Sequence, residues 1–241
     1  MTVRELVKRI LKYSPIALTK NQQYDRQTKR VIRKVCQHDT NTVDVGCHKG
    51  EILDILLEHA PDGVHYGFEP IPGLFHSLEA KYSGFANCHI LDFALSNVKG
   101  SSSFNLVLDD PALSGLKKRA YNPGYRSQTI EVKTERLDDI IPATTKVGLI
   151  KIDVEGGELQ VLMGASELIC RSKPVIIFEH GQGASEFYGT RPEHVFDLLE
   201  KCGLKVSLMS RWLKQGPALP KAGFIEQYQK KVNYYFIAYP D

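Results

Sequence analysis

Residues 42–50 read Thr-Val-Asp-Val-Gly-Cys-His-Lys-Gly, and the helical apolar pattern of residues 51–60 follows at once. The apolar run up to Gly46 predicts a buried strand that turns directly into a helix. Such a turn places backbone N–H groups and a helix N-terminus at the carboxyl edge of a sheet, where open α/β sheets bind ligands. Gly46 permits a close approach of backbone to ligand, Gly50 allows tight helix packing, and the Asp44 carboxylate can accept hydrogen bonds from a cationic group. The stretch therefore predicts a binding turn in a parallel sheet.

The same alternation continues along the chain and decides the fold class. Strands are expected at 42–46, 64–69, 87–91, 148–154, 174–179, 204–209 and 234–239, and helices at 51–60, 72–82, 155–169 and 192–202. Strand–helix–strand repetition indicates a mostly parallel sheet with helices on its faces. The sequence therefore predicts a Rossmann-like α/β fold.

Two regions interrupt this alternation. Strand-like segments at 101–107 and 129–134, with a polar stretch between them, are expected to form an excursion over the edge of the sheet. Residues 211–232 are expected to be a basic loop. Ser114 and the aromatic residues of that loop, Trp212, Phe224 and Tyr228, are candidates for the border of a substrate pocket, with core packing equally open for the aromatics.

The residues in and after the turn favour a ligand that contains a nucleoside. A dinucleotide fingerprint would place glycine at position 48, where this chain has His48. Glu69, at the end of the second predicted strand, is placed to bind both hydroxyls of an adenosine ribose. Asp92 is expected to face the adenine amine, with the main chain of Phe93 and Ala94 on its ring. The alternatives are that Asp44 and Asp92 cap local structure and Glu69 is simply exposed.

Three separated motifs resemble the FkbM-type methyltransferases. They are Val43-Asp44-Val45-Gly46-Cys47-His48-Lys49-Gly50, Phe68-Glu69-Pro70, and Leu149-Ile150-Lys151-Ile152-Asp153-Val154-Glu155-Gly156-Gly157-Glu158 with the later Met163-Gly164-Ala165. The resemblance covers roughly residues 40–180. It departs at Cys47 and His48, where the family usually has alanine and asparagine.

This resemblance implies a seven-stranded sheet whose last strand is antiparallel, with S-adenosylmethionine as methyl donor. It also implies O-methylation of sugars or natural-product hydroxyls. The binding turn with Cys47 and His48, and Pro70 beside Glu69, would then belong to the cofactor site.

Carboxylates at the predicted strand ends are the catalytic candidates. Asp153 ends the fourth strand of the sheet and can act as a base, orient the acceptor or help to bind a metal. Glu155 and Glu158 are expected to share one helix face, where capping competes with catalysis. Glu179 and His180 end the next strand, and a histidine there is a candidate base. Asp153, Glu179 and His180 together suit a divalent metal such as magnesium, whose presence stays open.

Composition limits the class of protein. At 241 residues and 42% hydrophobic content, one large catalytic domain is expected at residues 39–241, preceded by a basic helical arm at 1–38. Residues 1–34 carry a net charge of +8, so the remainder carries −5. Within the arm, residues 3–11 place apolar residues at helical spacing between basic ones, which suits packing on the domain or a weak contact with a membrane surface or another anionic partner.

Location and partners follow from the same data. No apolar run is long enough to span a bilayer and no signal peptide is evident, so a cytoplasmic protein is expected. The five scattered cysteines are expected to be reduced thiols. Self-association is left open.

Three functions remain in competition. The first is an O-methyltransferase acting on a sugar, glycan or small natural product. The second is an RNA methyltransferase that uses the basic arm, although nucleic acid is the less favoured partner. The third is a module that binds a nucleoside cofactor without catalysis.

Overall fold

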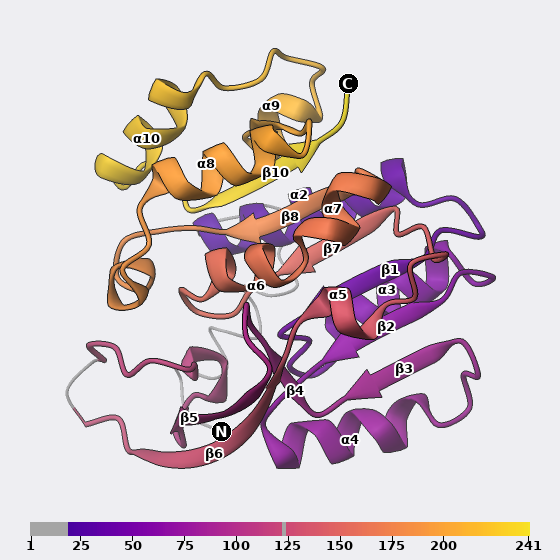
Figure 1. Ribbon diagram of the computed structural model, residues 1–241, viewed down its shortest axis with the longest axis vertical. Coiled ribbons are helices and arrows are strands. Elements are labelled where there is room, and N and C mark those ends of the chain that lie inside the picture. Colours follow the sequence, from indigo (N-terminus) through magenta and orange to yellow (C-terminus); the bar gives the residue numbers. More distant parts are fainter. Residues whose placement is uncertain (1–18, 122–123) are drawn as a thin grey trace.

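A computed structural model describes residues 19–121 and 124–241 of the chain. Its main sheet has seven strands in the order β3-β2-β1-β7-β8-β10-β9 (Figure 1). These strands are β1 Thr42–Val45, β2 His65–Phe68, β3 Cys88–Leu91, β7 Leu149–Ile152, β8 Val175–Glu179, β9 Lys205–Ser207 and β10 Tyr235–Tyr239. The predicted Rossmann-like class is confirmed.

Strand pairing places the first and fourth strands of the sheet side by side. β1 pairs in parallel with β2 and with β7, and β7 pairs in parallel with β8. β10 runs antiparallel to both of its neighbours, as the resemblance implied for the last strand. β1 and β7 are buried at every position, which is typical of central parallel strands covered on both faces. The carboxyl ends of β1, β2, β7 and β8 therefore meet at one edge.

Helices cover both faces of the sheet. One face packs on α6 Glu158–Gly164, α7 Ser166–Ser172, α8 Pro192–Lys201 and α10 Lys221–Gln229, around the largest hydrophobic cluster. The other packs on α2 Lys20–Val35, α3 Glu51–His59, α4 Pro72–Tyr82 and α9 Met209–Trp212. In Figure 1 α6 and α7 lie in front of the sheet and α2 behind it.

The excursion forms a sheet of its own. Strands β4 Phe93–Leu95, β6 Ser127–Glu135 and β5 Gly100–Val107 lie in that order, and the 3₁₀ turn η1 Pro111–Leu113 follows β5. Asn105 and Gly115 form a further bridge that folds the connection back onto β5. β4 was not predicted, because three residues are too short for an alternation pattern. Figure 1 shows this small sheet beside β1, β2 and β3.

The expected helix over 155–169 was wrong in two respects. α6 begins at Glu158, since Glu155 and Gly156 adopt positive φ angles of 59° and 107° that a helix cannot contain. The helix also divides at Ala165 into α6 and α7. Glu155 and Glu158 therefore do not share a helix face, and Glu155 stands in the turn before α6.

Two further expectations were wrong. Residues 211–232 are not a loop throughout, because α10 begins after Pro220, which fits the preference for proline near a helix start, and buries Phe224. Cys170 in α7 and Cys202 after α8 form a disulfide with a Cα–Cα distance of 4.3 Å, so this pair is not reduced. The expectation rested on the absence of a local cysteine motif, and this pair is 32 residues apart.

The basic arm is partly described. Its residues 20–35 form α2, which Thr19 caps through a reciprocal capping box with Gln22 and which buries Tyr24, Val31 and Ile32 against the sheet. The amphipathic segment 3–11 lies outside the described residues. Among those residues, no helix has both the length and the apolarity that a membrane crossing requires. The cytoplasmic location stays a prediction.

Candidate active site

A cavity lies where the carboxyl ends of β1, β2 and β7 face the small sheet. The main sheet supplies one wall, while Phe104 of β5, η1 and the chain after it supply the other. The cavity's lining residues are Val45, Gly46, His48, Phe68, Glu69, Pro70, Ile71, Phe93, Ala94, Leu95, Phe104, Pro111, Ala112, Ser114, Leu116, Asp153, Val154, Glu155, Gly157 and Tyr188.

Gly46 joins two parts of the wall. Its φ angle is 76°, and a Cβ atom there would lie 2.1 Å from the Asp153 carbonyl oxygen. Only glycine combines this conformation with such a close approach. The end of β1 is thereby pressed against the end of β7, so the predicted binding turn and Asp153 line one cavity.

Glu69 is held by two backbone donors in the cavity wall that β1 and β2 build. Its Oε2 accepts the backbone N–H of His48 at 2.9 Å and its Oε1 that of Ile71 at 3.0 Å. Burial raises the pKa of this carboxyl to about 7, although both N–H donors oppose the rise. Each oxygen keeps lone pairs for a ligand hydroxyl. Two backbone dipoles therefore fix the carboxylate in the cavity wall.

Four of the predicted cofactor-binding residues do not line the cavity. Asp44 is fully buried behind it, 3.6 Å from the ammonium of Lys151, so its cationic partner is a protein side chain. Cys47 packs into the core under α3. Gly50, with a φ angle of 75°, packs against Tyr82 of α4.

Asp92 is the fourth. Its carboxylate forms an ion pair with Lys133 of β6 at 3.0 Å and does not line the cavity. The remaining candidates Gly46, His48, Glu69, Pro70, Phe93 and Ala94 all do, and Ser114 lines the cavity as expected for a border residue.

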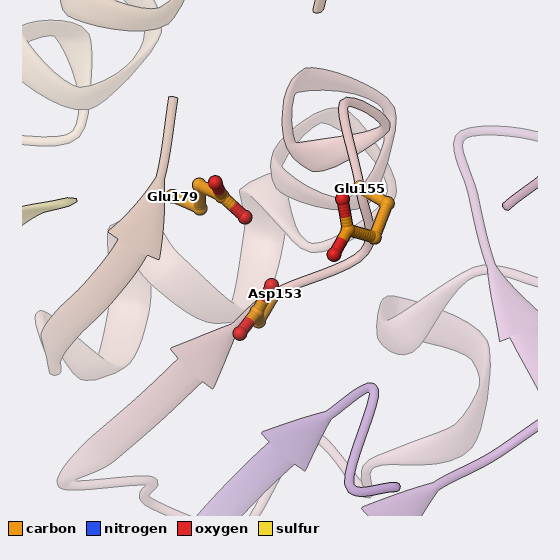
Figure 2. Close-up of side chains that lie close together, drawn as sticks. All are labelled: Asp153, Glu155 and Glu179. Carbon is orange, nitrogen blue, oxygen red and sulfur yellow. The ribbon is translucent and has the colours of Figure 1, made fainter. Parts of the chain in front are cut away.

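Three carboxylates gather at the other end of the cavity. One oxygen each of Asp153, Glu155 and Glu179 lies within 4.8 Å of the others. Figure 2 shows Asp153 at the tip of β7, Glu179 at the end of β8 and Glu155 in the turn before α6, with their carboxyl groups directed toward a common space. Only Asp153 and Glu155 line the cavity.

Asp153 is the ionised member of this group. Burial would raise its pKa, but the Lys151 ammonium at 3.4 Å and the hydroxyl of Tyr235, which donates to Oδ2, hold it below its ordinary value. Lys151 stays charged because Asp153 and Asp44 outweigh its own burial. The Asp153 carboxylate is therefore negative at neutral pH, with Lys151 and Tyr235 holding it in place.

Glu155 has the opposite balance. Burial, followed by repulsion from Asp153, raises the pKa of its carboxyl to about 8, while the Arg119 guanidinium at 2.5 Å opposes the rise. Arg119 comes from the excursion and is itself largely buried. Two neighbouring carboxyls with pKa values shifted apart are a frequent arrangement for acid–base work.

The other two glutamates serve local structure. Burial and the charge of Asp153 raise the pKa of Glu179, which favours a protonated carboxyl that hydrogen-bonds to Asp153. Glu158 accepts the backbone N–H groups of Val154 at 3.2 Å and of Gly156 at 3.0 Å. It therefore holds the turn that presents Glu155.

His180 does not join the carboxylates, contrary to the expected metal set. It is fully buried between the rings of Tyr228 and Phe224, at centroid distances of 4.9 and 5.9 Å, and burial lowers its pKa to about 4. The reason is strand alternation, which turns His180 to the sheet face opposite that of Glu179. Phe224, Tyr228 and Trp212 likewise pack on the protein and line no part of the cavity.

Two residues of the site gave no signal in the sequence. Arg119 and Tyr188 come from irregular segments far along the chain from Glu155. Tyr188 accepts the backbone N–H of Lys117 at 3.1 Å and so ties the excursion to the segment after β8. Lys151 was visible as a charged residue inside an apolar strand, which is a signal for a paired charge.

Comparison with known proteins agrees with this fold. Residues 44–206 match the family model described as "Methyltransferase FkbM domain". A crystal structure of methyltransferase FkbM from Methylobacillus flagellatus KT superposes with a TM-score of 0.51 and 17% identity, over 84% of this chain and 44% of that one. The AMB antimetabolite synthetase AmbE of Pseudomonas aeruginosa PAO1 is 22% identical over 214 residues, which are 74% of this chain and 10% of AmbE.

The fold is Rossmann-like, with a cavity at the carboxyl edge of its main sheet. The family match, which spans more than half of the chain, makes the protein a member of the FkbM methyltransferase domain family, whose enzymes depend on S-adenosylmethionine. The chain spans less than half the length of the two relatives named above.

Proposed function

We propose that this protein transfers the methyl group of S-adenosylmethionine to a hydroxyl oxygen of a sugar, glycan or small natural product. The observation that carries the proposal is that Asp153 and Glu155 line the same cavity as Gly46 and Glu69. An ionised carboxylate and a carboxyl with a pKa near 8 thus stand beside the proposed donor site.

The cofactor would occupy the wall built by β1 and β2. Glu69 binds the ribose hydroxyls through the lone pairs that His48 and Ile71 leave open. Ile71, Phe93 and Ala94 provide an apolar slot for the adenine ring. Gly46 lets the backbone approach the remainder of the molecule.

The acceptor would lie against the carboxylates. When bound, S-adenosylmethionine supplies an electrophilic methyl group on a sulfonium, which calls for an acceptor oxygen in line with the S–CH₃ bond. Asp153, fixed by Lys151 and Tyr235, orients the acceptor hydroxyl by accepting its hydrogen bond. Ionised Glu155 takes up the hydroxyl proton as the new O–C bond forms and the S–C bond breaks.

Two protein cations, Lys151 and Arg119, neutralise the negative charge of the carboxylates at this site. The three carboxylates have the hard oxygen ligands that magnesium favours. Lys151 and Arg119 already lie 3.4 and 2.5 Å from Asp153 and Glu155, however, and place positive charge beside both. We therefore propose catalysis that does not depend on a divalent ion.

Calorimetry with S-adenosylmethionine, NAD and NADP tests the donor. The proposal predicts binding of S-adenosylmethionine alone, and binding of only a nicotinamide cofactor would contradict it. Incubation with hydroxylated sugars and small natural products, followed by mass spectrometry, then tests for an added methyl group on oxygen. Methylation only of RNA would contradict the proposed acceptor class.

A further inference from the structure

Tyr235 reaches the carboxylate end of the site from a strand outside the family match. It is the first residue of β10, and its hydroxyl donates to Oδ2 of Asp153. Because β10 runs antiparallel to β8, this first residue lies at the carboxyl edge of the sheet, paired with Glu179. The matched residues 44–206 end well before β10. One of the groups that hold Asp153 is thus an addition to the shared domain.

The first turns of α2, which precede the matched residues, bind the chain that leads into β10. The hydroxyl of Tyr24 donates to Oδ1 of Asn233 at 3.0 Å and accepts the backbone N–H of Tyr234 at 3.4 Å. One turn earlier, Oδ1 of Asn21 accepts the hydroxyl of Tyr234. Two residues of α2 therefore tether the two residues that come directly before Tyr235.

The ring of Tyr24 also packs on the ring of Tyr235. The two centroids lie 5.1 Å apart with the planes inclined by 30°, a separation at which aromatic rings attract each other. Tyr24 is buried in the cluster that α2 forms with Ile177 of β8 and Ile237 of β10, behind the sheet in Figure 1. Because protein interiors have few voids, removing the Tyr24 ring would leave a space into which the Tyr235 ring could turn.

The hydroxyl of Tyr235 helps to keep Asp153 ionised. Burial would raise the pKa of Asp153, while the ammonium of Lys151 and the hydroxyl of Tyr235 lower it. Protonated Glu179 also donates to Asp153, whereas Glu155 adds negative charge to the same space when it ionises. Because a hydrogen bond weakens steeply below an angle of about 120°, its strength depends on where the Tyr235 ring is held.

We propose that Tyr24 is a positioning residue, which holds the ring of Tyr235 so that the Tyr235 hydroxyl stays on Asp153. The helix α2 thereby belongs to the carboxylate end of the site, although Tyr24 does not line the cavity. The consequence for methyl transfer rests on the proposed function, in which Asp153 orients the acceptor. The contact between the three residues does not rest on it.

The test uses variants of the full chain labelled for NMR at the carboxyl carbons of aspartate. Tyr24→Leu removes both the ring and the hydroxyl, Tyr24→Phe keeps the ring, and Tyr235→Phe removes the donor to Asp153. A double variant combines Tyr24→Leu with Tyr235→Phe. The control is Ile32→Ala, because Ile32 is a fully buried residue of α2 in the cluster that contains Leu149, at the opposite edge of the sheet.

A pH titration of each variant gives the pKa of Asp153, whose resonance is identified by its loss in Asp153→Asn. Tyr235→Phe should raise this pKa by about 1 to 2 pH units, the effect of losing one hydrogen bond to a charged group. Tyr24→Leu should produce at least half of that rise. The double variant should rise no further than Tyr235→Phe alone, because Tyr24 acts through that hydroxyl.

The milder variant and the control separate positioning from stability. Tyr24→Phe should give a smaller rise than Tyr24→Leu, because the ring contact with Tyr235 remains. Ile32→Ala should lower the melting temperature and leave the pKa of Asp153 within about 0.3 pH units of its original value. Single-turnover transfer should fall roughly tenfold in Tyr24→Leu and in Tyr235→Phe, with the Kd for S-adenosylmethionine within about threefold.

Three results would overturn the proposal. They are an unchanged pKa of Asp153 in Tyr24→Leu or in Tyr235→Phe, additive rises in the double variant, and an equal rise in Ile32→Ala. The pKa of Asp153 is measured without an acceptor. Failure of this proposal is therefore distinguishable from failure of the proposed methyl transfer, which only the transfer rate reports.

Discussion

The two ends of the cavity hold their acidic groups by different means. At the cofactor end, backbone N–H groups of His48 and Ile71 fix Glu69. At the carboxylate end, the largely buried cations of Lys151 and Arg119 hold Asp153 and Glu155. Backbone donors give fixed geometry, whereas charged side chains set which carboxyl is ionised. We therefore propose that the first end binds the cofactor and that the second end transfers the proton.

Removing the proposed base gives the largest effect. Glu155→Gln keeps the shape of the side chain but cannot take up a proton, so kcat should fall about a hundredfold to ten-thousandfold. Steady-state kinetics at saturating S-adenosylmethionine measures this. A kcat within about threefold of the original would assign Glu155 a structural role only.

A change at the cofactor end should act on binding instead. Glu69→Gln presents an NH₂ group to one of the two backbone N–H donors and weakens the bond to the ribose. The Kd for S-adenosylmethionine should rise about tenfold to a hundredfold, the range of charged hydrogen bonds, with kcat at saturation nearly unchanged. A fall in kcat at unchanged Kd would remove the distinction between the two ends.

The pH dependence probes the ion pair at the carboxylate end. Glu155 acts as a base only when ionised, so the rate should rise with pH and reach half its maximum near pH 8. Arg119 opposes the raised pKa of Glu155. Arg119→Ala should therefore move the rising limb of the pH–rate profile to higher pH and slow the reaction roughly tenfold at pH 7. A limb that does not move in the variant would show that Arg119 does not set this ionisation.

Chelation should give the smallest effect. With Lys151 and Arg119 beside the carboxylates, EDTA should change kcat by less than about twofold. Loss of activity with EDTA and its recovery with magnesium would show that a metal, rather than these side chains, neutralises the site.

The sequence predicted the parts of the molecule that depend on local patterns. The strands of the main sheet and its mostly parallel character followed from alternation, α4 was predicted at its observed bounds, and Glu69 was found because an acid at the end of the second strand must face the ligand edge. The turn at Glu155 was missed because a positive φ angle at a glutamate has no sequence signature. Arg119 and Tyr188 were missed because long-range packing of irregular segments brings them to the site.

Burial separated residues that a motif groups together. Asp44, Cys47 and Gly46 belong to one stretch, yet of these three only Gly46 lines the cavity, because Asp44 is buried beside Lys151 and Cys47 packs into the core under α3. Strand alternation turned His180 away from Glu179. Identification of the site therefore came from the motif, and assignment of its members came from the structure.

The most direct test of the two-ended cavity is Asp153→Asn, measured by S-adenosylmethionine calorimetry and by single-turnover methyl transfer. If Asp153 orients the acceptor beside an independently held cofactor, the Kd for S-adenosylmethionine should stay within about threefold while the transfer rate falls at least about a hundredfold. A transfer rate that is unchanged, or cofactor binding that is lost to the same degree, would contradict the account.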